Sequence, residues 1–441
     1  MEIEEFQYKF RYTGIFSLNY FVQGINQSIF ATVVPVYLIV VLEFVDLAGL
    51  SFMLSFVLMP FILKIIYGIL SDKVKFRKIG RRKPWIIGPA SFSGIIWIII
   101  PVLLTINPLS AISIFTFGGF LAILGVAMAD TAMDGFILDI CPKELLGRTT
   151  GTVWAVRSIG IIIGGPLILL TLNFLDFRFV VFGLGILTIV FSLFALTIKH
   201  KEMTEAVDLI PNLKLMFKKR ENWKVYVFSL FMAIVDGVIF VFLALFILIQ
   251  LNIVEAMGAT TSILEEDITL YPAQAFIAFL TGIGVLLGAL IGGYLADKKS
   301  RRFVVYLKFI ITNGALLLLL IPIPAPFSWT FLILAVIVGA SSGWSNAAFS
   351  SVTSQYSQQY PQAPSTYYSI CTSFVNLGTQ LGLIFTGLVF DIVSGITTET
   401  LIIYSTVFIS MIILSNLALL PFILMKREIY EVDKELVKVK F

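Results

Sequence analysis

Charged residues are scarce in this sequence. Aspartate, glutamate, lysine and arginine make up 13% of its 441 residues, whereas soluble domains contain about 25%. Hydrophobic residues make up 58% of the chain. This composition excludes an ordinary soluble globular protein and indicates a protein of the membrane.

Histidine and cysteine are also rare. The one histidine, His200, lies between two lysines, so a solvated side chain is a better interpretation than a metal ligand. The two cysteines, Cys141 and Cys371, fall in or near different apolar stretches, which argues against a structural disulfide. No residue cluster resembles a metal site, and we expect no metal and no cofactor.

The residue sets that enzymes use are missing as well. A membrane enzyme acting on lipid would need a Ser/His/Asp set or metal ligands, and one interfacial histidine counts against it. The sequence contains no Gly-x4-Gly-Lys-Ser/Thr motif, so ATP-driven transport within this chain is not expected. We therefore expect that the protein is not an enzyme.

Twelve apolar stretches fill most of the chain. Each is long enough for a membrane-spanning helix, which needs about 20 residues, and too continuous for a barrel strand. A lipid-exposed backbone must satisfy its own hydrogen bonds, so the sequence predicts an all-α membrane protein. The stretches lie at 12–42, 47–70, 84–106, 111–139, 149–172, 178–198, 223–251, 271–295, 303–322, 328–352, 364–390 and 398–425.

Basic residues gather on one side of this predicted topology. With the N-terminus inside, 27 of the 31 lysines and arginines lie in cytoplasmic segments, and Arg178 alone lies in an external loop. The external loop 252–270 is acidic instead. The positive-inside rule then predicts a multi-pass protein of the cell membrane with both termini in the cytoplasm. The net charge of +4 is therefore no sign of nucleic-acid binding.

Two pairs of sequence marks recur at about half the chain length. Asp72 and Asp297 lie 225 residues apart, and each follows a glycine by four positions, Gly68 and Gly293. A glycine pair at 160 and 164 returns 218 residues later at 378 and 382. We predict two pseudo-symmetric six-helix bundles, residues 1–198 and 223–441, with the latter including a cytoplasmic tail. The charged linker 199–222 could form an amphipathic surface helix, although a solvated linker is the simpler interpretation.

These motifs resemble the major facilitator superfamily. Its signature after the second span is a Gly, three residues, Asp and a basic cluster, which here correspond to Gly68, Asp72 and the Gly80-Arg81-Arg82 run. A shorter copy follows at Gly293 and Asp297. The resemblance implies twelve transmembrane helices and a cytoplasmic gate, to which we also assign Arg148.

Two further segments are similar to one branch of that superfamily. The segments are PFILKIIYGILSD (60–72), which contains Lys64, and ADTAMDGFILDI (129–140) followed by GRTTG (147–151). The branch comprises folate–biopterin transporters, muropeptide permeases and acetyl-CoA transporters. In the fifth stretch, Ile168 and Leu169 replace the last glycines of the drug-antiporter motif, which argues against antiport.

Charges inside the apolar stretches are the candidate functional residues. Asp130 and Arg157 lie about 14 Å and 12 Å from the cytoplasmic ends of consecutive antiparallel stretches, so they could pair. The pair could carry protons or substrate, or it could be a fixed ion pair, and both interpretations stay open. Asp134 lies one turn from Asp130 and could belong to the cytoplasmic gate with Arg148.

Asp236 and Lys64 complete the charged candidates. Asp236 is the one charge inside the seventh stretch, and burial penalises the charged form of an unpaired carboxylate, which makes it a candidate for proton coupling. Its alternative is an uncoupled residue of a wet cavity wall. Lys64 could contact an anionic substrate group, but we prefer a side chain that extends to the cytoplasmic interface.

Amides recur in the first and eleventh stretches. Their spacing puts most of them on one helix face, where they could line a cavity for hydroxyls or amides or bind helices together. We favour cavity lining. The amides are Asn19, Gln23, Asn26, Asn376 and Gln380.

Together these features predict a secondary active transporter that moves a small polar organic solute by alternating access, with the proton as the expected coupling ion. We expect it to be a monomer in the lipid bilayer. A uniporter, or a receptor or structural protein on a transporter fold, is the alternative that the sequence leaves open.

Overall fold

The structure is a computed structural model in which long helices dominate. It describes residues 8–41, 47–74, 76, 80–107, 110–141, 146–172, 174–198, 209–253, 255–257, 260–262, 270–360 and 363–431. Within these residues the strands β1 (Glu255–Met257) and β2 (Thr260–Ser262) form one short antiparallel hairpin. The prediction of an all-α membrane protein is confirmed.

The first six predicted stretches each form one helical segment, and several include a short π or 3₁₀ turn. The elements are α1 Phe10–Ser28, π Ile29–Val33, α2 Val34–Val41; α3 Leu47–Leu58, 3₁₀ Met59–Leu63, α4 Lys64–Lys73; α5 Lys83–Ile106; α6 Ala111–Ser113, π Ile114–Gly118, α7 Gly119–Ile140; α8 Leu146–Ile162, π Ile163–Leu167, α9 Ile168–Thr171; and α10 Phe177–Leu193 with 3₁₀ Phe194–Thr197.

The last six stretches form longer, mostly uninterrupted helices. The elements are α12 Arg220–Gln250, α13 Leu270–Lys298, α14 Arg301–Leu319, 3₁₀ Ala325–Phe327, α15 Thr330–Ser357, α16 Pro364–Ser394, α17 Thr400–Asn416 and α18 Leu419–Ile423. Two short helices lie outside the stretches: α11 Leu209–Lys218 in the predicted linker and α19 Arg427–Tyr430 after the last stretch.

The predicted spans agree with these helices to within a few residues. Eleven described segments are long and apolar enough to cross a membrane. The twelfth prediction, 12–42, coincides with the continuous run of α1, the π turn and α2 over Phe10–Val41. Local chemistry marks several boundaries: the Ser300 hydroxyl accepts from the N–H of Phe303 and caps α14, and Pro364 opens α16.

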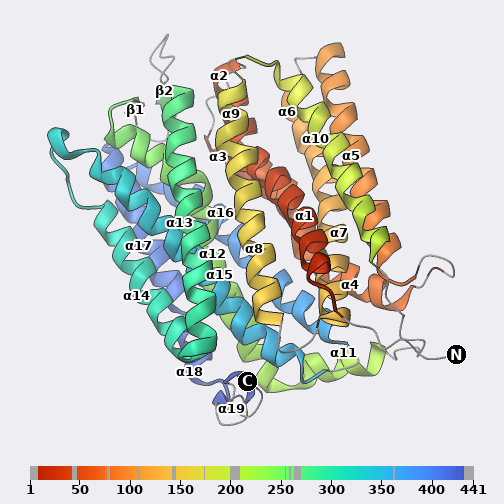
Figure 1. Cartoon of the computed structure of the whole chain (residues 1–441). Coiled ribbons are helices and arrows are strands. Elements are labelled where there is room, and N and C mark those ends of the chain that lie inside the picture. The colour runs from red at the N-terminus through yellow and green to blue at the C-terminus, as the bar shows by residue number, and fades with distance from the viewer. Residues whose placement is uncertain are drawn as a thin grey trace, which may run out of the picture.

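The helices form two groups that stand side by side. We call α1–α10 the N-bundle and α12–α18 the C-bundle. Figure 1 shows the N-bundle in red to yellow and the C-bundle in green to blue, with the described ends of the chain and α11 at one end of the molecule. The hairpin β1–β2 lies at the opposite end. We refer to these as the α11 end and the hairpin end.

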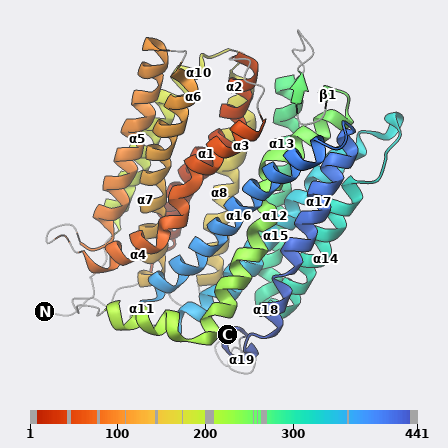
Figure 2. The same cartoon turned by 180° about the vertical axis from the view of Figure 1, so that it is seen from behind.

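Helix α11 runs along this end of the molecule from the N-bundle toward the C-bundle (Figure 2). The Met216 side chain is fully buried against the C-bundle, and Leu213 packs beside it. Residues 209–218 therefore form the amphipathic helix that the sequence offered as an alternative, and the preferred solvated linker is wrong for this part. Residues 199–208 of the predicted linker lie outside the described chain.

Close glycine contacts repeat between the two groups. A Cβ on Gly160 of α8 would come within 2.1 Å of the Phe21 carbonyl oxygen on α1. A Cβ on Gly378 of α16 would come within 2.0 Å of the Leu230 carbonyl oxygen on α12. The recurring glycines therefore have the same structural role in both bundles. Because each lacks a side chain, two helix backbones can come into direct contact.

Two helices of the C-bundle, α16 and α13, make most of the contact with the N-bundle. Helix α16 packs against α3, the 3₁₀ turn and α4, while α13 packs against α8 and α9. At the first of these contacts a Cβ on Gly68 would meet the Ser369 hydroxyl oxygen at 3.0 Å, so Gly68 marks a close approach of α4 and α16. This contact positions the charged residues described next.

Candidate functional site

Lys64, the first residue of α4, is buried inside the N-bundle. Its amino group donates to Asp130 of α7 in an ion pair whose two side chains are both nearly inaccessible. The same amino group lies 3.8 Å from Asp134. The structure therefore corrects our preference for Lys64, because its side chain turns inward to the acidic residues of α7 instead of extending to the membrane interface.

Asp134 lies one turn along α7 and has a second partner. The hydroxyl of Tyr20 on α1 donates to its carboxylate. Lys64, Asp130, Asp134 and Tyr20 thus form a connected set, which we call the Lys64 cluster. The side chain of Arg148, the predicted partner of Asp134, lies outside the described residues, so that pairing stays a prediction.

Arg157 does not complete the predicted pair with Asp130. Its guanidinium donates to Gln27 and stacks on the Trp154 ring at 4.5 Å. The physical reason is the close packing of α1 on α8, where a Cβ on Gly24 would come within 2.2 Å of the Arg157 carbonyl oxygen. Depth along two helices predicts a common level for Asp130 and Arg157, but it does not fix the face of the helix on which each side chain lies.

The predicted gate residues of the N-bundle form a buried network at the α11 end. Arg82 pairs with Asp72 at 2.5 Å and with Asp139 at 2.8 Å, and Arg81 pairs with Asp139 at 2.7 Å. Burial works against the charge of Arg82, but the two carboxylates outweigh it and raise the pKa of its guanidinium. Sequence reasoning missed Asp139, the third aspartate of the segment 129–140.

This network also reaches across to the C-bundle. The Thr366 hydroxyl, on the first turn of α16, donates to Asp72 at 2.5 Å, and Thr366 is fully buried. A hydrogen bond to a charged group contributes about 1.5–3 kcal/mol. Asp72 therefore joins the two bundles at the α11 end, and its role as a gate residue stays a prediction.

The second copy of the motif is built differently. A Cβ on Gly293 would meet no described atom within 4 Å, and the side chain of Asp297 lies outside the described residues. The N–H groups of Arg301 and Arg302 donate to the carboxylate of Glu431. In the described residues this copy thus caps α14 from the C-terminal segment and makes no contact equivalent to that of Gly68 with Ser369.

Asp236 of α12 has two polar neighbours. Ser342 of α15 donates to its carboxylate at 3.5 Å, and Lys308 of α14 is the charge that acts on it. Lys308 is fully buried, and its amino group donates to the Met232 carbonyl at 3.3 Å and to Ser415 at 3.1 Å. The C-bundle therefore also holds a buried cation near a carboxylate, but without direct contact.

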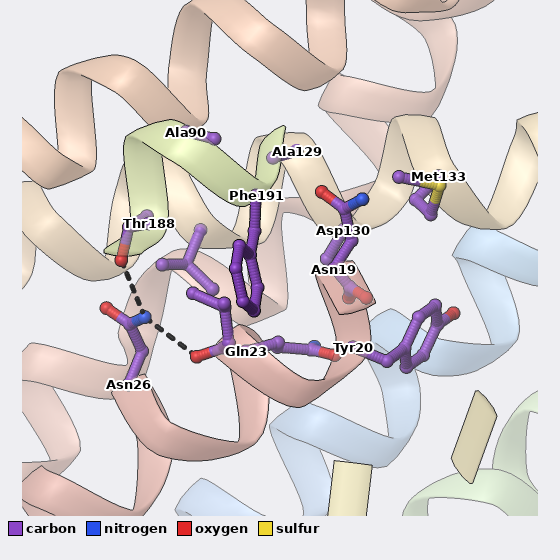
Figure 3. Close-up of a pocket in the computed structure, with 12 residues that line it drawn as sticks. Asn19, Tyr20, Gln23, Asn26, Ala90, Ala129, Asp130, Met133, Thr188 and Phe191 are labelled. Carbon is purple, nitrogen blue, oxygen red and sulfur yellow. Dashed lines mark hydrogen bonds between the residues drawn. The ribbon is translucent and has the colours of Figure 1, made fainter. Parts of the chain in front are cut away.

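Three of the predicted amides line a cavity inside the N-bundle (Figure 3). Asn19, Gln23 and Asn26 project from α1, and Asp130 borders the same space. The Asn26 side chain donates a hydrogen bond to Thr188 and accepts one from Trp97. The side-chain oxygen of Gln23 is buried with no partner among the described residues. The cavity-lining interpretation therefore fits these three residues.

The two predicted amides of α16, Asn376 and Gln380, differ in what their side chains contact. Asn376 donates to the Phe61 carbonyl of the N-bundle at 2.9 Å and so binds two helices together. The Gln380 carbonyl oxygen is buried and has no partner within the described chain. Equal spacing on one helix thus did not mean equal roles.

A second cavity lies between the bundles. Its walls come from α1, α8, α12, α13 and α15. Most of the lining is apolar, with hydroxyls and one amide, and Ser342, the neighbour of Asp236, is part of it. The polar lining residues are Ser28, Thr32, Ser158, Gln274, Thr281 and Ser342.

Sequence comparison identifies the family. The profile of the Major Facilitator Superfamily matches residues 16–265 and 256–438. The chain belongs to this superfamily. A relative within it, putative transporter AmpG 1 of Rickettsia conorii, is 23% identical over 355 residues, which cover 78% of this chain and 81% of that protein.

Solved structures show the same fold. The nucleoside transporter NupG, in a point-mutant form, aligns with a TM-score of 0.63 and 15% identity over 94% of this chain and 100% of that one. A second NupG structure aligns with a TM-score of 0.62 and 16% identity over 93% and 98% of the two chains. The family and fold are those of a transporter, as the sequence predicted, and the chain is a multi-pass membrane protein.

Proposed function

We propose that this Major Facilitator Superfamily protein is a proton-coupled secondary transporter of a small, uncharged polar organic solute. The observation that carries the proposal is the cavity between the bundles, whose mostly apolar walls bear five hydroxyls and one amide. Fixed basic groups are absent from the described lining, which favours a neutral solute over an anion.

The α11 end supports an alternating-access cycle. The bond from Thr366 to Asp72 and the contact of Gly68 with Ser369 join the bundles there. The cavity between the bundles lies beyond these contacts, toward the middle of the molecule. Breaking the contacts would give the cavity a path to the α11 end, which we place in the cytoplasm together with both termini.

The Lys64 cluster supports proton coupling. A proton on Asp130 would neutralise its charge and leave Lys64 paired only with Asp134, at 3.8 Å. Buried ion pairs are sensitive to the loss of one charge because the remaining charge is uncompensated in low dielectric. Proton binding at Asp130 would therefore alter the packing of α4 on α7 next to the contact between the bundles.

Purified protein in liposomes tests this proposal. A thermal-shift screen against neutral sugars, nucleosides and amides selects a ligand, because binding raises stability by RT ln(1 + [L]/Kd). Nucleosides belong in the screen because NupG, which shares the fold, is a nucleoside transporter. The selected solute should exchange in counterflow and accumulate under an imposed proton gradient.

Two outcomes contradict the proposal. Counterflow without accumulation under any proton gradient would exclude proton coupling. Stabilisation only by multiply charged anions would exclude the neutral solute class.

A further inference from the structure

The second membrane span is broken at a proline. Helix α3 ends at Leu58, a 3₁₀ turn covers Met59–Leu63, and α4 begins at Lys64. Pro60 lacks an N–H group, and in an α-helix its ring would collide with the carbonyl four residues earlier. The sequence itself therefore weakens the α-helix at this point.

Two side chains of α16 bind the backbone at the break. The Asn376 amide donates to the Phe61 carbonyl at 2.9 Å, and the Ser373 hydroxyl accepts from the Ile65 N–H at 3.0 Å. In an uninterrupted α-helix the Ile65 N–H would donate to the Phe61 carbonyl. The C-bundle thus takes the place of one internal hydrogen bond of the N-bundle.

Lys64 lies between those two backbone groups. A 3₁₀ helix turns about 120° and rises about 2.0 Å per residue, against about 100° and 1.5 Å for an α-helix. Changing five residues from one form to the other would rotate α4 relative to α3 by up to about 100° and shift it by about 2.5 Å. The contact of Lys64 with Asp130 would not survive such a rotation.

We propose that Asn376 and Ser373 are positioning residues for the Lys64–Asp130 pair. While α16 packs on the break, the turn stays 3₁₀ and Lys64 reaches Asp130. When the bundles separate at this contact, the Phe61 carbonyl and the Ile65 N–H bond to each other and α4 turns Lys64 away. The role of this arrangement in transport rests on the proposed function. Movement of the bundles would change the partner of Asp130, the carboxylate that is proposed to bind the proton.

Other groups facing the pair share its electrostatics. They are Asp134 on α7, Tyr20 on α1, Arg157 on α8 and Tyr368 on α16. The hydrogen bonds of Asn376 and Ser373 go to the backbone of the break and to none of these four side chains. The backbone of the break is therefore the direct route by which either substitution would act on the pair.

A distance measurement tests the device without any substrate. Spin labels at Ile66 on α4 and Phe92 on α5, both exposed, report the rotation of α4 within the N-bundle. The labelled chain carries alanine in place of Cys141 and Cys371. Asn376→Leu should add a second distance population displaced by about 5 Å or more, as expected for a helix face turned through up to about 100°.

Controls keep this test decisive. Asn313→Leu removes the hydrogen bond that the Asn313 side-chain amide donates to Asn416 inside the C-bundle, and this variant should show one distance population. Ser373→Ala is the milder variant if Asn376→Leu does not fold, and it should show the same second population. A single unchanged distance in both variants would overturn the proposal.

A stability cycle separates positioning from simple packing. Asn376→Leu should lower the melting temperature of the wild-type chain more than that of the Lys64→Met, Asp130→Asn chain, in which no pair remains to be positioned. Equal losses in both backgrounds would reduce Asn376 to helix packing and overturn the proposal. Both measurements are independent of transport, so a protein that proves uncoupled to protons would refute the proposed function and leave this inference standing.

Discussion

Lys64 and Asp130 form a buried ion pair between α4 and α7, and α4 also packs against α16 at the contact between the two bundles. The pair brings together two residues that lie 66 positions apart in the sequence. Because Lys64 is the partner of Asp130, the Arg157 guanidinium donates instead to Gln27 on α1. The coupling candidates of the N-bundle are therefore centred on a lysine, and the following changes test what that lysine does.

Removing one member of the pair should destabilise the protein strongly. Lys64→Met or Asp130→Asn leaves the other residue without its buried counter-charge, which costs about 3–5 kcal/mol. The double variant should be more stable than either single one. Denaturation of the purified protein in detergent measures all three differences.

Arg157→Gln is the matched control. Arg157 lies near the same aspartates, but its own contacts are with Gln27 and Trp154, so its loss should not be rescued by Asp130→Asn. Rescue of Arg157→Gln by Asp130→Asn, with no rescue of Lys64→Met, would show that the functional pair is the one predicted from sequence.

Asp236 and Lys308 should show weaker coupling. Lys308 is fully buried, yet it bonds to the Met232 carbonyl and Ser415 and does not touch the carboxylate. Asp236→Asn should therefore cost less stability than Asp130→Asn, and Lys308→Met should partly restore it, because the two charges attract through the low-dielectric interior. Thermal melts of the two single variants and the double variant give the comparison.

Transport adds a second measurement at Asp236. If this carboxylate couples protons, Asp236→Asn should retain counterflow and lose the pH dependence of uptake. An unchanged pH profile would exclude Asp236 from proton coupling.

Loss of the bond between Thr366 and Asp72 should open the α11 end. Thr366→Val removes a hydrogen bond to a charged group, worth about 1.5–3 kcal/mol, so the open population should rise about tenfold or more. Ser369 of α16 lies against Gly68 in this contact and is buried, so the rate at which N-ethylmaleimide alkylates Ser369→Cys measures the opening in a chain with alanine at Cys141 and Cys371.

Thr353→Val provides the control, because the Thr353 hydroxyl donates within its own helix and joins no second element. It should leave the alkylation rate of Ser369→Cys unchanged. Asp72→Asn should impair transport while the protein still folds. Wild-type alkylation in Thr366→Val, or wild-type transport in Asp72→Asn, would remove Asp72 from the gate.

The sequence predicted the spans well because long apolar runs have one structural solution in a lipid bilayer. It also found most of the charged residues that meet, because a charge inside such a run has to be accommodated. It did not find their partners. Lys64 and Asp130 meet because the break at Pro60 sets the direction of α4, and Arg157 turns to Gln27 because glycine contacts bring α1 onto α8. Those directions depend on tertiary packing, which residue spacing does not encode.

Glycine substitutions should separate packing from flexibility. Gly160→Ala would drive a methyl group to 2.1 Å from the Phe21 carbonyl oxygen, so α1 and α8 must move apart at a cost of about 1–3 kcal/mol. Gly378→Ala should cost a similar amount at the equivalent contact in the C-bundle. Melting temperatures in detergent measure both.

Gly183→Ala is the matched control on α10, where a Cβ would meet no described atom within 4 Å. It should be neutral or slightly stabilising, because alanine favours the helix. Equal effects at Gly183 and Gly160 would mean that helix propensity, and not close packing, explains the recurring glycine marks.

The orientation in the membrane rests on the uneven distribution of basic residues. Of the 31 lysines and arginines, 27 lie in segments that our topology places in the cytoplasm and one in an external loop. Glu205→Cys in the linker and Thr260→Cys in the hairpin should then react with a membrane-impermeant thiol reagent from opposite sides. In intact cells Thr260→Cys should label and Glu205→Cys should label only after permeabilisation, whereas the unsubstituted chain, whose Cys141 and Cys371 are buried, should stay unlabelled in both. Labelling of both positions from outside would break the topology, and the reverse pattern would invert it and move the gate of Asp72 to the external face.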